Sequence, residues 1–238
     1  TVRHGGFIPW DDDMDISMKR EDYERFVKYA QKELPKSFLI INYRNQEEYW
    51  DVMSRVINSD FICLDPEFVE KYHNCPYASG VDIFPLDYVT RDKEAEKLQK
   101  ELIEFVKSVA DTWGQGKMKP DELEGWLVQV ETFCHQKVDR KGDLKKQLYK
   151  IVCALYALFR EDEADEIALM ALHMDDGSGT YPKECYADAV RMPFDCITIP
   201  VPIGYDFVLT KKYGDYMKNV RKGGTHDYPC YERQEQLY

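Results

Sequence analysis

No stretch of this sequence is apolar for long enough to cross a membrane. A spanning helix needs about 18 consecutive apolar residues, and no run in the 238-residue chain approaches that length. The chain also does not open with the basic and then apolar pattern of a secretory signal peptide. Both absences favour a cytoplasmic protein, for which peripheral association with the inner face of the membrane is the remaining form of membrane contact.

Basic residues are scarce relative to acidic ones. Lysine and arginine total 32 against 44 aspartates and glutamates, which gives a formal net charge of −12. A surface of this charge repels a phosphate backbone, so extended nucleic acid is excluded as an expected partner. Small phosphate-containing molecules remain candidate ligands, because a metal ion and a few well-placed basic side chains can reverse the local electrostatic field.

The cysteines form no recognisable pattern. There are seven, an odd number, and they are scattered without any C-x-x-C pair. This excludes a disulfide framework and a thiolate zinc site from the expected features. We expect reduced, mostly buried thiols. Internal repeats and low-complexity segments are also missing, and the length suits a single globular domain or a domain with a helical appendage.

What the chain does have is an acidic run close to its start. Four carboxylates fall within five positions, at Asp11, Asp12, Asp13 and Asp15. If this stretch is an extended strand, Asp13 and Asp15 project from one side about 7 Å apart, which lets them share divalent cations. Met14 and Ile16 would then point the other way into a core.

A second interpretation of the acidic run stays open. Aspartate is a favoured turn and N-cap residue, so the run could be a solvated loop. A calcium loop of the EF-hand kind is excluded, because counting from Asp11 the required glycine and glutamate positions hold Ile16 and Asp22.

Apolar spacing along the chain predicts strands near the start and helices in the middle. The expected strands are Phe38–Ile41, Tyr49–Ile57, Phe61–Leu64, Gly80–Asp87 with Pro85 ending it, and Cys196–Ile199. The expected helices are Arg20–Leu34, Pro66–Tyr72, a long helix from Lys93, Asp121–Val138, Leu144–Phe159, Glu163–Met174 and Gly204–Val220. This pattern indicates a catalytic core over residues 1–92, a helical region over 93–175, and a return segment over 176–238 that packs on the core and ends in a polar tail.

Asp82 is a charged residue inside one of the expected strands, between apolar neighbours. Together with a D-x-D pair, a third carboxylate from a neighbouring strand makes a site of hard oxygen ligands that suits Mg²⁺ or Mn²⁺. Two such ions can stabilise the attacking and the leaving oxygen in phosphoryl chemistry. A paired or edge-exposed aspartate is the alternative for Asp82. Asp87 is less specific, because its surroundings also fit a turn.

The segment R-H-G-G-F-I-P-W-D-D-D-M-D-I at residues 3–16 resembles the signature of the LicD family of phosphocholine transferases, relatives of the fukutin-related proteins in the nucleotidyltransferase-fold superfamily. Four further blocks resemble the family in the same order. They are G-V-D-I-F-P-L-D at 80–87, M-P-F-D at 192–195, I-P-V-P with G-Y-D at 199–206, and Y-G-D-Y-M at 213–217.

The resemblance implies an α+β fold with a small mixed β-sheet flanked by helices and an additional helical region. It implies Asp13, Asp15 and Asp82 as metal ligands and catalytic residues, with Asp82 also expected to deprotonate the acceptor. The implied reaction moves phosphocholine from CDP-choline to a sugar hydroxyl of a cell-surface glycan, such as teichoic acid or lipopolysaccharide, or of its precursor, and CMP leaves. The superfamily's phosphate-binding h-G-[GS] turn is expected upstream of Thr1, and Asp195 stands where many relatives have glutamate.

Several other residues are candidates for binding substrate. Arg3 and His4 could supply positive charge beside the acidic strand, although a surface salt bridge is the alternative for Arg3. Trp10 could stack on cytosine or face the choline ammonium, with a core role as its alternative. Weaker candidates are Asp12, Arg55, Asp87 and His226.

Two other functions remain open at this point. One is a nucleotidyltransferase that places a nucleoside monophosphate on a small hydroxyl compound and releases pyrophosphate. The other is a non-catalytic module that binds a glycan or a partner and keeps the metal site for structure alone.

Overall fold

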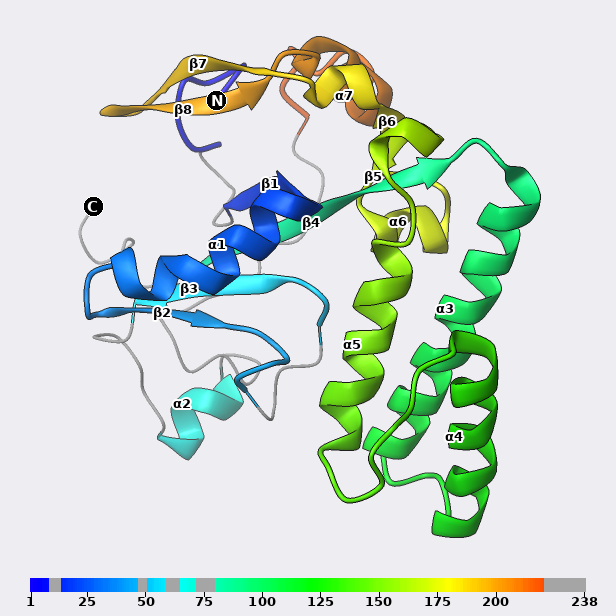
Figure 1. The fold of residues 1–238 in the computed structure, drawn as a ribbon. Coiled ribbons are helices and arrows are strands. Elements are labelled where there is room, and N and C mark those ends of the chain that lie inside the picture. Colours follow the sequence, from blue (N-terminus) through cyan, green and yellow to red (C-terminus); the bar gives the residue numbers. More distant parts are fainter. Residues whose placement is uncertain (9–13, 47–50, 59–64, 72–79, 221–238) are drawn as a thin grey trace. The chain divides into compact units, whose positions relative to one another are not determined.

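The computed structural model describes residues 1–8, 14–46, 51–58, 65–71 and 80–220 (Figure 1). Helices and strands alternate irregularly along these residues, which confirms the α+β class. The strands are β1 (Asp15–Lys19), β2 (Phe38–Ile41), β3 (Ser54–Asn58), β4 (Gly80–Thr90), β5 (Ala164–Ala168), β6 (Thr180–Pro182), β7 (Ala189–Phe194) and β8 (Ile197–Pro202). The helices are α1 (Arg20–Glu33), α2 (Pro66–Lys71), α3 (Lys93–Gly114), α4 (Pro120–Cys134), α5 (Leu144–Tyr156), α6 (Met170–Asp175) and α7 (Tyr205–Tyr213), with short 3₁₀ turns η2 (Glu161–Glu163) and η3 (Lys183–Tyr186).

Strand β4 organises the main sheet. The sheet has six strands in the order β2-β3-β4-β5-β6, and β1 also pairs with β4, while β7 and β8 form a separate hairpin. The first half of β4 is antiparallel to β3, with Gly80 to Ile83 opposite Ile57 to Ser54. Its second half is antiparallel to β5, beginning with Asp87 opposite Ala168. One long strand therefore pairs with three others, β1, β3 and β5.

Pro85 was expected to end this strand, and that prediction is wrong. β4 continues to Thr90, since Pro85 lies between the residues that pair with β3 and those that pair with β5. A proline lacks the N–H that a ladder requires, so it is tolerated where the strand changes partners.

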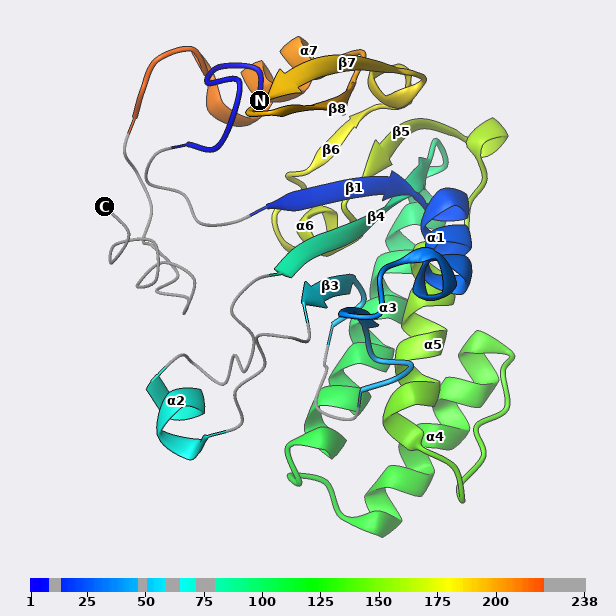
Figure 2. The same ribbon diagram turned by 90° about the vertical axis from the view of Figure 1, so that its left-hand side faces the viewer.

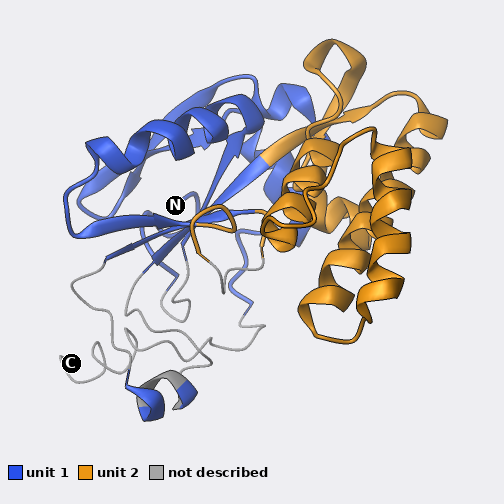
Figure 3. Ribbon diagram, turned by 60° about the horizontal axis from the view of Figure 1, so that its bottom comes forward, with its two compact units in different colours: residues 1–41, 53–85, 181–238 blue, residues 42–52, 86–180 orange. Residues whose placement is uncertain are grey.

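The described chain divides into two compact units (Figure 3). Unit 1 comprises residues 1–41, 53–85 and 181–238, and unit 2 comprises residues 42–52 and 86–180. In unit 1, α1 packs against β1 and β2 (Figures 1 and 2). Tyr23 is the buried anchor of α1, and its hydroxyl lies 2.6 Å from Ser54 Oγ of β3.

Unit 2 is mainly helical, and its core lies between α3, α4 and α5. Helix α3 is capped by Asp92, whose side chain accepts from the N–H groups of Glu94 and Ala95, and Asp143 caps α5 in the same manner. α5 carries the apolar stripe that the sequence predicts as core, and Leu148, Ile151, Val152 and Leu155 are all buried. The stripe packs against α3.

Three local expectations are wrong. Residues 164–168 of the expected helix Glu163–Met174 form strand β5, because they pair with β4, and only Met170–Asp175 is helical. The expected helix Gly204–Val220 ends at Tyr213, where Gly214 adopts a φ of +66° that terminates it. Ile16 does not enter a core, since 39% of it is exposed.

The remaining strand predictions have different outcomes. Phe38–Ile41 is confirmed as β2, whereas the run Tyr49–Ile57 becomes a strand only from Ser54 onward. Phe61–Leu64 lies outside the described residues. The four cysteines in the described part of the chain are free thiols, two of them buried. Among the described residues, no helix combines the length and the apolar character that crossing a membrane requires.

Candidate active site

Asp82 and Arg55 form a paired centre in unit 1. They are directly opposite each other in the β3–β4 register. The guanidinium donates from Nε to Oδ1 and from Nη2 to Oδ2 of the carboxylate, so the pair is bidentate. The side chain of Arg55 is 18% exposed, and that of Asp82 is 9% exposed. A carboxylate this deeply buried needs a counter-charge, and the two-pronged geometry of arginine provides one.

Asp15, the last residue of the acidic run, opens β1, which pairs with β4. The N–H of Asp82 donates to the carbonyl of Met14 at 3.1 Å, and β1 begins with the next residue, Asp15. Asp15 is exposed. The structure thus brings Asp15, one residue of the expected D-x-D pair, to the start of a strand that pairs with the strand carrying Asp82.

Four of the candidate residues lie outside the described residues, namely Asp12, Asp13, Trp10 and His226. In the part of the chain that is described, no group of three metal-ligating side chains comes together. Asp15 and Asp82 nevertheless have the hard oxygen donors that Mg²⁺ and Mn²⁺ prefer. In donor type these two residues therefore fit a divalent cation.

Arg3 fastens the start of the chain to its later part. Its Nη1 donates to the carbonyl oxygens of Tyr216 at 2.8 Å and Lys218 at 3.0 Å, and its Nε donates to Nδ1 of His4 at 3.2 Å. These backbone contacts replace the surface salt bridge that was its alternative. The hydrogen bond from Nε of Arg3 also holds the imidazole of His4 through Nδ1.

The glycine pair after His4 accommodates the β7–β8 turn. Asp195 occupies that turn with a φ of +51°, and its N–H donates to the carbonyl of Gly5 at 2.6 Å. A Cβ at Gly6 would lie 2.3 Å from Oδ1 of Asp195, so the position has no space for a side chain. Beside it, the rings of Phe7 and Phe194 meet edge to face, 4.9 Å apart.

A hydrogen bond from the hydroxyl of Tyr216 connects the last two matching blocks. Tyr216 donates to Oδ1 of Asp206 at 2.7 Å, and this hydrogen bond raises the pKa of Tyr216 to about 12. Blocks from residues 3–7, 192–195, 204–206 and 213–217 thus form one connected cluster within unit 1. Sequence reasoning singled out the blocks but missed these contacts, because no local pattern reports them.

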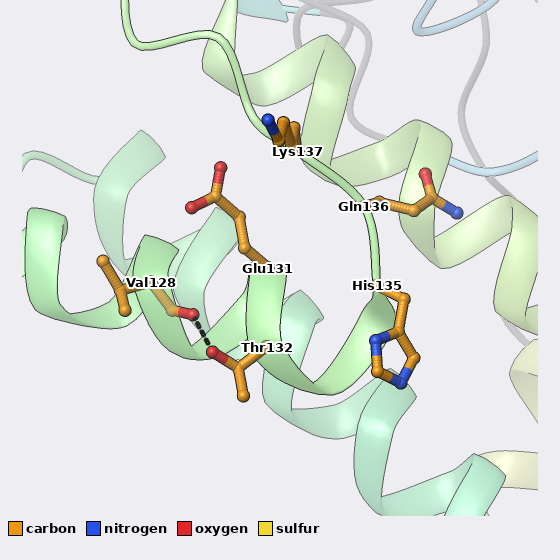
Figure 4. A pocket seen from close by; sticks show the side chains of 6 residues that line it. All are labelled: Val128, Glu131, Thr132, His135, Gln136 and Lys137. Carbon is orange, nitrogen blue, oxygen red and sulfur yellow. Dashed lines mark hydrogen bonds between the residues drawn. The ribbon is translucent and has the colours of Figure 1, made fainter.

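Asp87 is not part of this cluster. It is 1% exposed and lies in unit 2, opposite Ala168 of β5. A hollow in unit 2, of about 580 Å³, is also separate from the candidate residues (Figure 4). It lies at the end of α4 and is lined by Val128, Glu131, Thr132, His135, Gln136 and Lys137.

Comparisons with known proteins point to one family. A family model described as LicD/FKTN/FKRP, nucleotidyltransferase domain, matches residues 1–111. Over 224 residues the chain is 26% identical to a Haemophilus influenzae protein named lipopolysaccharide cholinephosphotransferase LicD. That alignment covers 92% of this chain and 78% of the relative. No solved structure matches the chain.

Proposed function

Because residues 1–111 of this chain match the nucleotidyltransferase domain of the LicD family, we propose that the protein transfers phosphocholine to a sugar hydroxyl of a cell-surface glycan or its precursor. The donor in this proposal is CDP-choline and the leaving group is CMP. The relative from Haemophilus influenzae carries the name of a lipopolysaccharide cholinephosphotransferase, which supports lipopolysaccharide as the acceptor class.

The observation that carries the proposal is the junction of β1 with β4. It places Asp15 next to the strand from which the buried Asp82 projects. A divalent cation held by Asp15 and Asp82, and by Asp13 as the third expected ligand, would neutralise charge on the transferred phosphoryl group. In the transfer, the acceptor oxygen would form a bond to the phosphorus of phosphocholine, the bond to the CMP oxygen would break, and the hydroxyl proton would pass to the carboxylate of Asp82.

The chain's own residues position these groups. Arg55 orients the carboxylate of Asp82 through two hydrogen bonds, and strand pairing fixes the backbone on either side. Arg3 and the Gly6–Asp195 contact hold the segment that leads into the acidic run. Such fixed positioning is the main contribution that a protein makes to phosphoryl transfer. The cytoplasmic location follows from a nucleotide-activated donor and remains a prediction.

The test is CMP release from CDP-choline with Mg²⁺ or Mn²⁺ and a lipopolysaccharide-type acceptor. Asp82→Asn and Asp15→Asn should each lower turnover by at least about 100-fold, because the loss of one oxygen ligand disables the cation site. Asp22→Asn is a matched control, since Asp22 is exposed on α1 and pairs only at 3.5 Å with Arg25. It should keep full activity.

Product analysis separates the alternatives. Mass spectrometry would detect phosphocholine on the acceptor if the proposal is right, and a nucleoside monophosphate on the acceptor with release of pyrophosphate if the chain is a nucleotidyltransferase. Divalent-cation binding without turnover on any acceptor would instead favour a non-catalytic module.

A further inference from the structure

Arg55 and a divalent cation would compete for the carboxylate of Asp82. Both carboxylate oxygens of Asp82 accept an N–H from the guanidinium. These are the same oxygens that a divalent cation would use under the proposed function. A guanidinium and a divalent cation repel each other across a single carboxylate, and the repulsion is weakly screened because the Asp82 side chain is only 9% exposed.

The stem of Arg55 is held by its packing on Gly80, and its head extends beyond that contact to Asp82. A Cβ at Gly80 would lie 3.2 Å from Cδ and 3.3 Å from Cγ of Arg55, so the stem packs directly on the glycine. Strand pairing with Asp82 fixes the Arg55 backbone. Beyond Cδ only the terminal torsions remain, and rotation about these moves the guanidinium without moving the stem.

We infer that Arg55 is an exchangeable counter-ion, which pairs with Asp82 in the empty protein and turns to the donor's phosphate groups when a divalent cation takes its place. The fork of N–H donors that matches a carboxylate also matches a phosphate, so the exchange loses no hydrogen bonds. This role rests on the proposed function and adds a donor-binding residue to it.

The inference predicts opposite effects on two ligands, which calorimetric titration can measure without turnover. Arg55→Met removes the competing charge, so Mn²⁺ alone should bind at least threefold more tightly than to the wild type. CDP-choline added with saturating Mn²⁺ and no acceptor should bind at least tenfold more weakly, because the phosphate loses its partner. A merely structural role for Arg55 would weaken both.

Two further variants sharpen the test. Arg55→Lys keeps the charge and loses the fork, so Mn²⁺ affinity should stay within about twofold of the wild type while CDP-choline affinity falls. Arg140→Met removes a guanidinium that pairs with Glu124 and Glu131 in unit 2, and it should change neither affinity. If Arg55→Met does not fold, Arg55→Gln answers the same question, because it keeps a hydrogen-bond donor without the charge.

Unchanged or weaker Mn²⁺ binding by Arg55→Met, or unchanged CDP-choline binding, overturns the inference. A wild type that does not bind Mn²⁺ overturns it as well. A wild type that binds both ligands and shows the expected changes in its variants, yet transfers no phosphocholine, would overturn the proposed function and leave the exchange of Arg55 standing.

Discussion

Gly6 shows how tightly a single position can be specified. Its Cα faces the carboxylate of Asp195, and an added methyl group would overlap Oδ1 at 2.3 Å. The backbone of Asp195 is held, because its N–H is bonded to Gly5 and its φ lies in the left-handed region, but its side chain is exposed and can rotate. An added methyl group would therefore force the Asp195 side chain out of its present rotamer.

Gly6→Ala should accordingly destabilise the protein by about 0.5–1.5 kcal/mol, the usual cost of forcing a side chain off its preferred rotamer. Denaturant unfolding measures the change. The matched control is Gly125→Ala in α4, where nothing lies within 4 Å of the added Cβ and where alanine should stabilise the helix by about 0.5–1 kcal/mol. Adding Asp195→Gly to Gly6→Ala should restore part of the loss. Equal stability of the two alanine variants would refute this account.

At the scale of elements, α3 and α6 meet at a buried ionic cluster in unit 2. His173 Nδ1 lies 2.8 Å from Thr180 Oγ1, and its Nε2 lies 3.1 Å from Glu96 Oε1 without the geometry of a hydrogen bond. Burial lowers the pKa of His173, and Lys100 lowers it further, while Glu96 and Glu166 oppose them. Burial pushes the pKa of Glu96 upward, but hydrogen bonds from Lys93 and Lys100 hold it below its usual range.

This cluster should make unit 2 sensitive to mild acid. Below about pH 6.5 His173 is protonated at its ordinary pKa in the unfolded chain, whereas its lowered pKa keeps it neutral in the folded chain. The unfolded state therefore binds more protons, and the free energy of unfolding decreases as the pH is lowered. His173→Asn should remove this part of the decline, by up to about 1.4 kcal/mol per pH unit. Urea unfolding of both proteins at pH 7.5 and pH 5.5 measures it. Parallel declines in the wild type and the variant would contradict the assignment.

For the whole molecule, cation binding and folding should be linked. A ligand that binds only the folded state stabilises it by about 2.7 kcal/mol at 100 times its dissociation constant. For a chain of this length that raises the melting temperature by roughly 5 to 10 °C. Mn²⁺ should therefore raise the melting temperature of the wild type, and a chelator should reverse the rise.

The Asp82→Asn variant separates this effect from general screening. The chain carries a net charge of −12, so any salt relieves some self-repulsion. Sodium chloride at matched ionic strength accounts for that contribution. Asp82→Asn should start from a lower melting temperature, because Arg55 loses its counter-charge, and should show no rise beyond the salt control. A full Mn²⁺ response in Asp82→Asn would exclude Asp82 as a ligand.

The sequence by itself determined the class of the fold, most helices and the resemblance to the LicD family, since these depend on local periodicity and on contiguous motifs such as residues 3–16. It also marked Asp82, because a charged residue inside an apolar strand requires a partner. Only the tertiary structure decided which partner. The β3–β4 register joins Arg55 to Asp82 across 27 positions, and no local pattern encodes that pairing.

The same reason explains the errors at residues 164–168 and at Pro85. Residues 164–168 have no strand-like alternation, and they became a strand because the second half of β4 offered them a ladder. Pro85 was tolerated because the strand changes partners there. Hydrogen-bond partners distant in sequence override local propensity in both cases, as they do where Asp195 closes over Gly6.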